Sequence, residues 1–301
     1  MRVLVTGGAG FIGSHLVDVL VDQGHAVAVL DDLSRGKREW VDPRADLHLA
    51  DIRDADAVQR VVDAVQPEAV AHLAALHFIP AVDDAPDLAH AVNVTGTKNV
   101  LAALRAHAPR RLIFASTAAV YPDVVGPISE TTPPDPIDLY GRTKVEGEKL
   151  VTEFAQKTGA ETVIARLFNV IGARETNPHL VPEVVDQLKR AETTLRLGNT
   201  SPRRDYTDAA DVAVALAALL QTAPRGSTFN VGSGYGVSVV DVIRLCEKIL
   251  GRQISVEVDP ARVRKIDRQE LVADATTLRE ATGWSPTRTL PQTLAALLGE
   301  A

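Results

Sequence analysis

Apolar residues gather in short runs along the chain, and most of these runs are continuous rather than alternating with polar positions. Continuous runs rich in Val, Ile and Ala are typical of strands buried on both faces of a parallel sheet. Seven such segments begin near Val3, Ala26, Leu47, Ala69, Leu112, Val163 and Thr228. Helical periodicity lies between them, as in Ile12–Leu16–Val19–Leu20, which closes at Gly24. The alternation predicts an α/β fold with a doubly wound, parallel, seven-stranded Rossmann sheet.

The pattern of residue types along the chain changes after Gly172. Irregular stretches rich in Pro, Arg and Thr occupy 173–182 and 196–207. Such stretches are typical of loops and lids over a ligand. A helical pattern near 208–221 and the strand-like Phe229–Asn230–Val231 then return to the earlier alternation.

The C-terminal part, 237–301, contains three helical patterns around one extended piece, Ile254 to Val258. This arrangement predicts a second, smaller α/β C-terminal lobe made of two separated pieces. We expect the Rossmann domain to comprise 1–172 plus 208–236, and the smaller lobe 173–207 plus 237–301.

Composition narrows the class of protein. The 301 residues are 46% hydrophobic, which is enough to bury a large core. The net charge is −7 with acidic and basic residues interspersed, so the sequence offers no basic patch for nucleic acid or for an anionic membrane. The longest apolar runs, such as 69–76, are too short to span a bilayer. We expect neither nucleic acid nor membrane as a partner.

Cysteine and histidine usage bears on the compartment and on metals. Cys246 is the only cysteine, and the first strand begins at the N-terminus with no room for a signal peptide. Together these features predict a cytoplasmic protein. The histidines at 72, 77, 90, 107 and 179 show no metal-ligand spacing, so we expect no metal.

A glycine-rich turn follows the first strand and opens a helix. Gly7 permits a tight turn, Gly10 lets backbone N–H groups approach a pyrophosphate, and Gly13 lets the helix pack closely on the sheet. A glycine triplet alone is weak evidence, but here a strand precedes it and a helix follows. The segment therefore predicts a dinucleotide-binding site.

Two adjacent carboxylates, Asp31 and Asp32, end the second strand. A carboxylate at this place accepts hydrogen bonds from the adenosine ribose hydroxyls and repels a 2′-phosphate. The pair predicts NAD as the cofactor rather than NADP. Arg35 could pair with a phosphate, but we interpret it as a solvated loop residue.

The glycine spacing GxxGxxG and the order of the motifs after it resemble the extended short-chain dehydrogenase/reductase family over nearly the whole chain. Within that resemblance, 49–54 is similar to the adenine-binding segment, with Asp51 meeting the amino group of the base. Asp51 could equally cap the helix that follows. The segment 72–75 is similar to the strand end that passes under the cofactor. The implied cofactor contacts are Phe11, Ile12, Asp51, Ile52, Leu73, Ala74, Ala75 and Asn93.

Tyr140 and Lys144 belong to the segment YGRTK, which matches the YxxxK motif of that family. On a helix, residues four apart share a face, so the phenol and the ammonium point the same way. A nearby cation favours phenolate and lowers the tyrosine pKa from about 10. Tyr140 is thus predicted as a general base, and Lys144 as its partner and as a ligand of the nicotinamide ribose.

Ser116 and Thr117 end a buried strand, where open sheets present groups to ligands. Thr117 aligns with the catalytic Ser/Thr of the family. Ser116 is the second candidate for that role, since it could instead make a strand-end hydrogen bond. Related dehydratases usually carry Asp–Glu after the threonine. This chain has Ala118–Ala119, which cannot move protons and resembles the 4-epimerases. Pro122 departs from the usual glycine and alters only the following loop.

The resemblance also implies contacts to a nucleotide-diphosphate sugar. Asn169 matches an asparagine that hydrogen-bonds the diphosphate, and Arg204 matches an arginine that clamps it with a planar fork of donors. Arg264 resembles a second diphosphate arginine, with Arg262 and Arg268 as competitors. The implied substrate-binding set is His77, Ser116, Thr117, Asn169, Leu180, Leu197, Arg204 and Arg264.

The activity that the resemblance implies is NAD-dependent 4-epimerisation of a nucleotide sugar, as in the family's UDP-glucose 4-epimerase-like branch. Tyr140 with Thr117 would take the proton of the 4-hydroxyl while hydride passes from carbon 4 to NAD, and hydride would return to the other face of the 4-keto sugar. A nucleotide-sugar 4-ketoreductase and a GDP-sugar dehydratase-type enzyme remain alternatives. A non-catalytic NAD(H)-binding protein remains a third, although such proteins usually lose the tyrosine or the lysine. By the same resemblance, helices near 90–106 and 140–157 predict a homodimer.

Overall fold

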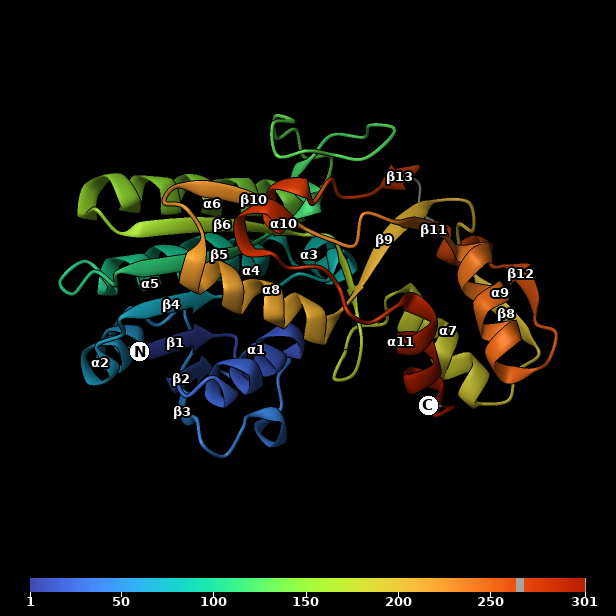
Figure 1. Ribbon diagram of the computed structural model, residues 1–301, viewed down its shortest axis with the longest axis horizontal. Helices are drawn as coiled ribbons and strands as arrows, with labels where there is room; N and C mark the ends of the chain where they lie inside the picture. The colour runs from blue at the N-terminus through green and yellow to red at the C-terminus, as the bar shows by residue number, and fades with distance from the viewer. Residues whose placement is uncertain (264–267, 301) are drawn as a thin grey trace.

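The computed structural model describes residues 1–263 and 268–300 (Figure 1). Its central sheet has seven strands in the order β10-β6-β5-β4-β1-β2-β3, and every neighbouring pair is parallel. The bounds are β1 Arg2–Thr6, β2 Ala26–Asp31, β3 Asp46–Leu49, β4 Ala69–His72, β5 Arg111–Thr117, β6 Glu161–Leu167 and β10 Ser227–Val231. This confirms the predicted seven-stranded parallel sheet.

Helices cover both faces of the sheet. Helices α1 (Phe11–Asp22) and α8 (Ala209–Thr222) pack together on the face toward the viewer in Figure 1. Helices α2 (Ala55–Val65), α5 (Thr97–Ala103) and α6 (Leu139–Thr158) cover the opposite face. Each face has its own core of Val, Leu, Ile and Ala side chains, and the central strands contribute to both cores. Burial on both faces is why these strands read as continuous apolar runs.

A second lobe lies at the far right of Figure 1, beside the carboxyl ends of the strands. Strand β9 (Arg203–Asp208) organises it, since it pairs with β7 (Asn169–Ile171), β11 (Gly236–Ser238) and β13 (Glu270–Leu271). A separate pair joins β8 (Thr194–Leu197) to β12 (Ser255–Val258). Its helices are α7 Leu180–Lys189, α9 Val239–Leu250 and α11 Leu290–Leu298. This lobe has its own apolar core, as the smaller α/β prediction requires.

The remaining short helical elements are α3 Ile79–Asp84, α4 Pro86–His90, η2 Ala91–Gly96, α10 Thr276–Thr282, η1 Arg38–Trp40, η3 Ala118–Val120 and η4 Pro260–Arg262. Near the C-terminus, Leu278 of α10 and Trp284 pack into the core of the Rossmann sheet rather than into that of the second lobe. The proposed domain boundaries therefore stay a prediction. Among the described residues, no helix combines the length and apolar character needed to cross a bilayer.

The strand order places the site. The order in which the chain adds strands reverses between β1 and β4: β1, β2 and β3 follow one another toward one edge of the sheet, and β4, β5, β6 and β10 follow one another toward the other edge. In open parallel sheets, ligands bind at the carboxyl ends of the strands beside such a reversal. The second lobe stands over that edge.

Candidate active site

A cleft of about 1380 Å³ opens between the carboxyl edge of the sheet and the second lobe. Both lobes contribute to its wall. The predicted site residues that line it are Gly7, Gly10, Phe11, Ile12, Gly13, Asp31, Asp32, Asp51, Ile52, Leu73, Ala74, Ala75, His77, Ser116, Thr117, Tyr140, Lys144, Asn169, Leu180, Leu197 and Arg204. Asn93 does not line this cleft, and Arg264 lies outside the described residues. Their individual roles stay predictions.

The glycine turn leaves space only for backbone. Gly7 has φ +72, and a Cβ there would lie 2.7 Å from the backbone nitrogen of Ala74. A Cβ on Gly13 would lie 2.0 Å from the carbonyl oxygen of Gly7. The first turn of α1 therefore presses against the turn that precedes it, with its N–H groups facing the cleft. Such a cradle fits a pyrophosphate.

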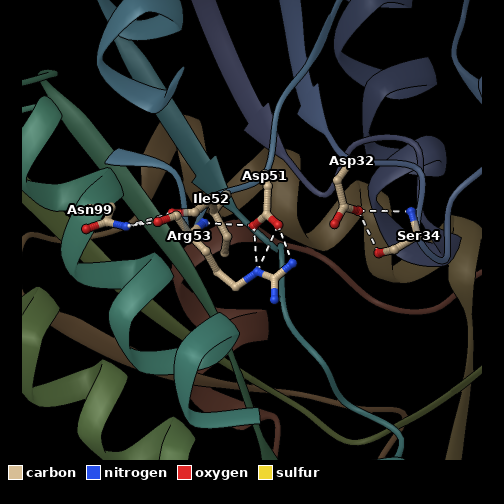
Figure 2. A network of polar contacts seen from close by, with 6 residues as sticks. All are labelled: Asp32, Ser34, Asp51, Ile52, Arg53 and Asn99. Carbon is tan, nitrogen blue, oxygen red and sulfur yellow. Dashed lines mark hydrogen bonds and ion pairs between the residues drawn. The ribbon is translucent and has the colours of Figure 1, made fainter. Parts of the chain in front are cut away.

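The carboxylate of Asp31 accepts hydrogen bonds from the backbone N–H groups of Ala9 (3.0 Å) and Leu33 (2.8 Å). Burial raises its pKa, those two N–H bonds lower it, and the neighbouring charge of Asp32 raises it further. Asp32 in turn accepts from Ser34, as Figure 2 shows. Two acidic groups at this edge suit a ribose diol better than a 2′-phosphate.

Asp51 pairs with a residue that the sequence analysis missed. Its carboxylate accepts from the guanidinium and the backbone N–H of Arg53 (Figure 2), and the bonds from Arg53 lower its pKa. Asn99 of α5 donates to the carbonyls of Ile52 and Arg53, both at 3.0 Å. Arg53 also lines the cleft. The part of the cleft where we expect the adenine base therefore contains the ion pair of Asp51 and Arg53. The only sign of this pair in the sequence is that the two residues are two positions apart.

His72 braces the floor of the cleft from below. The ring is buried between the hydroxyls of Thr6 (2.6 Å from Nδ1) and Thr97 (2.9 Å from Nε2). Thr97 gives its own proton to the carbonyl of Asn93, so Nε2 of His72 donates to Thr97 and Nδ1 accepts from Thr6. Burial lowers the pKa of His72 to about 3, and the charge of Lys144 lowers it further. The neutral ring of His72 on β4 therefore links Thr6 of β1 to Thr97 of α5.

Helix α6 presents Tyr140 as its second residue, within the first turn. Asp138 caps the helix by accepting from the N–H of Gly141 at 2.7 Å. A Cβ on Gly141 would lie 2.3 Å from the carbonyl oxygen of Ala119, so only glycine lets the helix approach η3 this closely. That approach brings the Tyr140 phenol next to the side chain of Thr117, which lowers the pKa of the phenol.

Burial dominates the electrostatics of Tyr140 and Lys144. Burial raises the pKa of Tyr140, the hydrogen bond with Thr117 lowers it, and Asp138 raises it. Lys144 donates instead to the carbonyl of Ala115 at 2.8 Å and lies over the ring of Phe114. Burial lowers the pKa of Lys144 to about 7, against a raising influence of Glu148. Burial is thus the largest influence on the pKa of Tyr140 in the protein alone, and the lowering expected from Lys144 stays a prediction.

Ser116 makes the strand-end hydrogen bond that was its alternative role. Its hydroxyl donates to the carboxylate of Glu148 at 2.6 Å, away from Thr117. Glu148 also receives a bidentate pair from Arg166, at 2.9 and 2.7 Å. Arg166 extends the network to the phenol of Tyr121, 3.0 Å away. This buried network supports the strand that carries Thr117.

The side chain of Asn93 joins two parts of the fold. It is 2% exposed, and its amide bonds both the N–H (2.8 Å) and the carbonyl (2.9 Å) of Leu76, and the hydroxyl of Thr143 (3.0 Å). Both donors of its amide nitrogen and one acceptor site of its oxygen thus join the segment after β4 to α6. The direct cofactor contact of Asn93 stays a prediction.

The second lobe supplies the other wall. The amide oxygen Oδ1 of Asn169 is buried without a hydrogen-bond partner among the described residues. Arg204 is half-buried beside it on β9 and gives one donor to the carbonyl of Arg203 at 2.9 Å. Of the two competitors of Arg264, Arg262 pairs with Glu183 at 2.8 Å, whereas Arg268 is buried in the cleft wall.

His77 contacts two residues that lie far from it in the sequence, Asn177 and His179. Its Nε2 accepts from the amide of Asn177 at 3.1 Å, and the ring of His179 lies 6.0 Å away between centroids. Burial lowers the pKa of His77 to about 4, as do Lys144 and Arg35, while a backbone hydrogen bond to Ala75 raises it. The sequence analysis missed this neighbourhood because its members come from different lobes.

Comparison with known proteins identifies the family. The sequence model described as the NAD dependent epimerase/dehydratase family matches residues 3–232. A UDP-glucose 4-epimerase of Corynebacterium glutamicum is 36% identical over 96% of this chain and 92% of its own length. A UDP-arabinose 4-epimerase of Arabidopsis thaliana is 32% identical over 96% of this chain and 76% of its own.

Solved structures agree with these sequences. The UDP-glucose 4-epimerase of Thermotoga maritima with UDP-glucose superposes with a TM-score of 0.93 at 31% identity, over 100% of this chain and 98% of that one. The Thermus thermophilus UDP-glucose 4-epimerase complex with NAD gives 0.91 at 34%, with the same coverage. The chain therefore belongs to the NAD dependent epimerase/dehydratase family.

Proposed function

We propose that this protein is an NAD-dependent 4-epimerase of nucleotide-diphosphate sugars. The observation that carries the proposal is that Tyr140 and Thr117 lie next to each other in the wall of the cleft that holds both the glycine turn and the second lobe. A proton acceptor there would lie between bound NAD and the sugar. Ala118 and Ala119, buried next to it, offer no proton to expel a leaving group.

The residues of the chain divide the chemistry among them. NAD, when bound, accepts a hydride from carbon 4 of the sugar and returns it. Tyr140 takes the proton of the 4-hydroxyl and later gives it back to the 4-keto oxygen, while Thr117 holds the phenol in line. Burial raises the pKa of the phenol. Lys144, anchored on Ala115, supplies the nearby positive charge and a contact for the nicotinamide ribose.

Inversion requires the sugar to present both faces while its nucleotide stays bound. We assign the firm grip to the second lobe. The unpartnered Oδ1 of Asn169 and the half-buried guanidinium of Arg204 face the same cleft. An arginine fork matches two diphosphate oxygens at once. With the pyrophosphate held, the sugar turns about its linkage.

For the substrate, we propose UDP-glucose and UDP-galactose, because the relatives named above include UDP-glucose 4-epimerases at 36% identity over most of the chain. The UDP-arabinose relative makes a pentose the second candidate. A 4-ketoreductase would prefer NADPH and release its cofactor, against which the paired carboxylates of Asp31 and Asp32 argue.

We also propose a homodimer in the cytoplasm. Helix α6 and the helical segment from α4 to α5 lie next to each other on one side of the sheet, and Leu88 of α4 is 41% exposed there. A second copy would bury that side chain. The single cysteine, Cys246, is buried and requires no oxidising compartment. Size-exclusion chromatography with light scattering tests the dimer, and a monomer mass at micromolar concentration would contradict it.

The deciding experiment is Tyr140→Phe, assayed by proton NMR of carbon 4 in UDP-glucose and UDP-galactose. We expect turnover to fall to background while NAD and UDP-sugar still bind, because only the proton acceptor is lost. Tyr235→Phe is the matched control, since Tyr235 is 77% exposed and does not line the cleft, and it should behave as wild type. Turnover by Tyr140→Phe would refute the assigned base. Net NADPH consumption with a 4-keto sugar would favour the reductase.

A further inference from the structure

Three potential metal ligands converge at the edge of the cleft. His77, Glu175 and His179 each offer a ligand atom, and these atoms all lie within 4.8 Å of one another. His77 follows β4 in the Rossmann domain, whereas Glu175 and His179 belong to the segment between β7 and α7. The fold thus joins residues about a hundred positions apart in the chain.

Two imidazoles and one carboxylate form a ligand set that zinc uses in proteins, with a fourth position left to water. Zinc–ligand bonds of about 2.0–2.2 Å separate tetrahedral ligand atoms by roughly 3.3–3.5 Å. The present triangle is at most somewhat wider than that. All three residues are half-buried, so the ligands are partly withdrawn from water yet open to an ion from the cleft.

The side chain of Asn177 gives an independent indication of where a cation fits. Its amide nitrogen donates to Nε2 of His77 at 3.1 Å and to Oε1 of Glu175 at 3.3 Å. An N–H donor that bridges an imidazole lone pair and a carboxylate oxygen makes the contacts that a cation would make. The amide of Asn177 therefore occupies the place that the ion would take. A bound metal would displace this amide by rotation of the Asn177 side chain.

The ligands are already oriented by their surroundings. Oε1 of Glu175 accepts from the backbone N–H groups of Thr176 (2.9 Å) and Asn177 (2.8 Å), while Oε2 has no donor among the described residues. A backbone hydrogen bond to Ala75 holds His77. The His179 ring packs edge-on against Phe78, 5.2 Å between centroids. Hydrogen bonds that fix ligand orientation in this way strengthen metal sites.

We propose that His77, Glu175 and His179 bind a divalent transition-metal ion of the zinc type, which fastens the segment before α7 to the segment after β4. Leu180, next to His179, lines the cleft, so the ion would hold the second-lobe wall in place. The prediction of no metal was based on spacing within the sequence, and the proposed site crosses between lobes. It is independent of the proposed epimerisation.

The test uses the full chain after removal of metals with EDTA. Titration with Zn²⁺ by calorimetry, and with Co²⁺ by its visible absorption, should give one ion per chain. His179→Gln and Glu175→Gln should each weaken binding at least about tenfold. His90→Gln, an exposed histidine of α4 paired only with Glu146, is the matched control and should bind as wild type. Absence of binding, or equal binding in all variants, would overturn the proposal.

Two further readouts do not depend on loss of function. Asn177→Ala should bind Zn²⁺ more tightly than wild type, because the competing amide is gone, and weaker binding would contradict the position assigned to the ion. Trypsin cleavage after Arg174, which pairs with Asp18 of α1 at 2.8 Å, should slow with Zn²⁺ in wild type but not in His179→Gln. Unchanged cleavage with bound Zn²⁺ would refute the fastening role.

Discussion

Arg268 of the second lobe bonds the carboxylate of Asp138, the residue that caps the catalytic helix α6, at 3.2 Å. The same guanidinium donates to the carbonyls of Ala119 (3.0 Å) and Tyr121 (3.1 Å), just beyond Thr117. One arginine therefore ties together the two segments that bring Thr117 and Tyr140 into contact. The lobe for which we propose the grip on the nucleotide thus also positions the proposed base.

Arg268→Lys should reduce turnover more than NAD binding, because an ammonium keeps the charge but cannot reach three acceptors with a planar fork. We expect kcat to fall about tenfold, equivalent to about 1.4 kcal/mol in the barrier. Arg196→Lys is the control, since Arg196 is 71% exposed and pairs only weakly with Glu257. Steady-state kinetics with an NAD titration measure both quantities. Equal kcat in the two variants would show that Arg268 does not position the pair.

Gly13→Ala should abolish tight NAD binding, since its Cβ would lie 2.0 Å from the carbonyl oxygen of Gly7 and the phosphate cradle must shift. A loss of at least about tenfold corresponds to about 1.4 kcal/mol. Gly226→Ala is the comparison, because Gly226 has φ +71 but no atom within 4 Å of its added Cβ. That variant should lose some stability and keep its NAD affinity. Unchanged NAD affinity in Gly13→Ala would contradict the cradle.

Glu148→Gln should lower the free energy of unfolding by about 3–5 kcal/mol, because it leaves the charge of Arg166 without its partner in the interior. The side chains of Arg166 and Glu148 are only 6% and 9% exposed. Glu153→Gln, on the same helix, removes an exposed pair with Lys157 and should cost less than about 1 kcal/mol. Urea unfolding monitored by circular dichroism compares them. Similar losses for both would mean that the buried pair stabilises no more than a surface pair.

Stability should decrease in mild acid through His72. Its folded pKa is lowered to about 3, so below its unfolded value of about 6.5 only the unfolded chain binds the proton. Its contribution is therefore present above that value and lost as pH falls. From about pH 7.5 to about pH 5.5, this residue alone should cost about 1.4 kcal/mol. Urea unfolding at both pH values, with EDTA present, should show a shallower loss in His72→Asn. An identical loss in the variant would assign the effect to other groups.

Local patterns were sufficient for the sheet and for the residues gathered at its edge. Continuous apolar runs predict buried parallel strands because such strands have no solvent face, and the strand–glycine–helix order predicts the turn at Gly7. The four-residue interval of Tyr140 and Lys144 places both on one helical face. Each of these inferences needs only a few consecutive residues. Gly7, Tyr140 and Lys144 all line the cleft in the structure.

Other properties depended on which distant residues meet. Asn93 of η2 hydrogen-bonds Leu76 and Thr143, which no spacing within one segment reveals. Burial, which no short segment reveals either, raises the pKa of Tyr140. The contact of Arg268 with Asp138 joins positions 130 residues apart.

The sequence by itself determined the type of fold and the glycine turn, and it proposed the residues for catalysis, since these follow from periodicity and from spacing within one element. Only the tertiary structure decided the electrostatic state of the phenol, the direction of Ser116 and the meeting of His77 with Glu175 and His179. Those outcomes depend on desolvation and on contacts between lobes. Both arise when the chain closes on itself, because burial and long-range distances are not properties of any single segment.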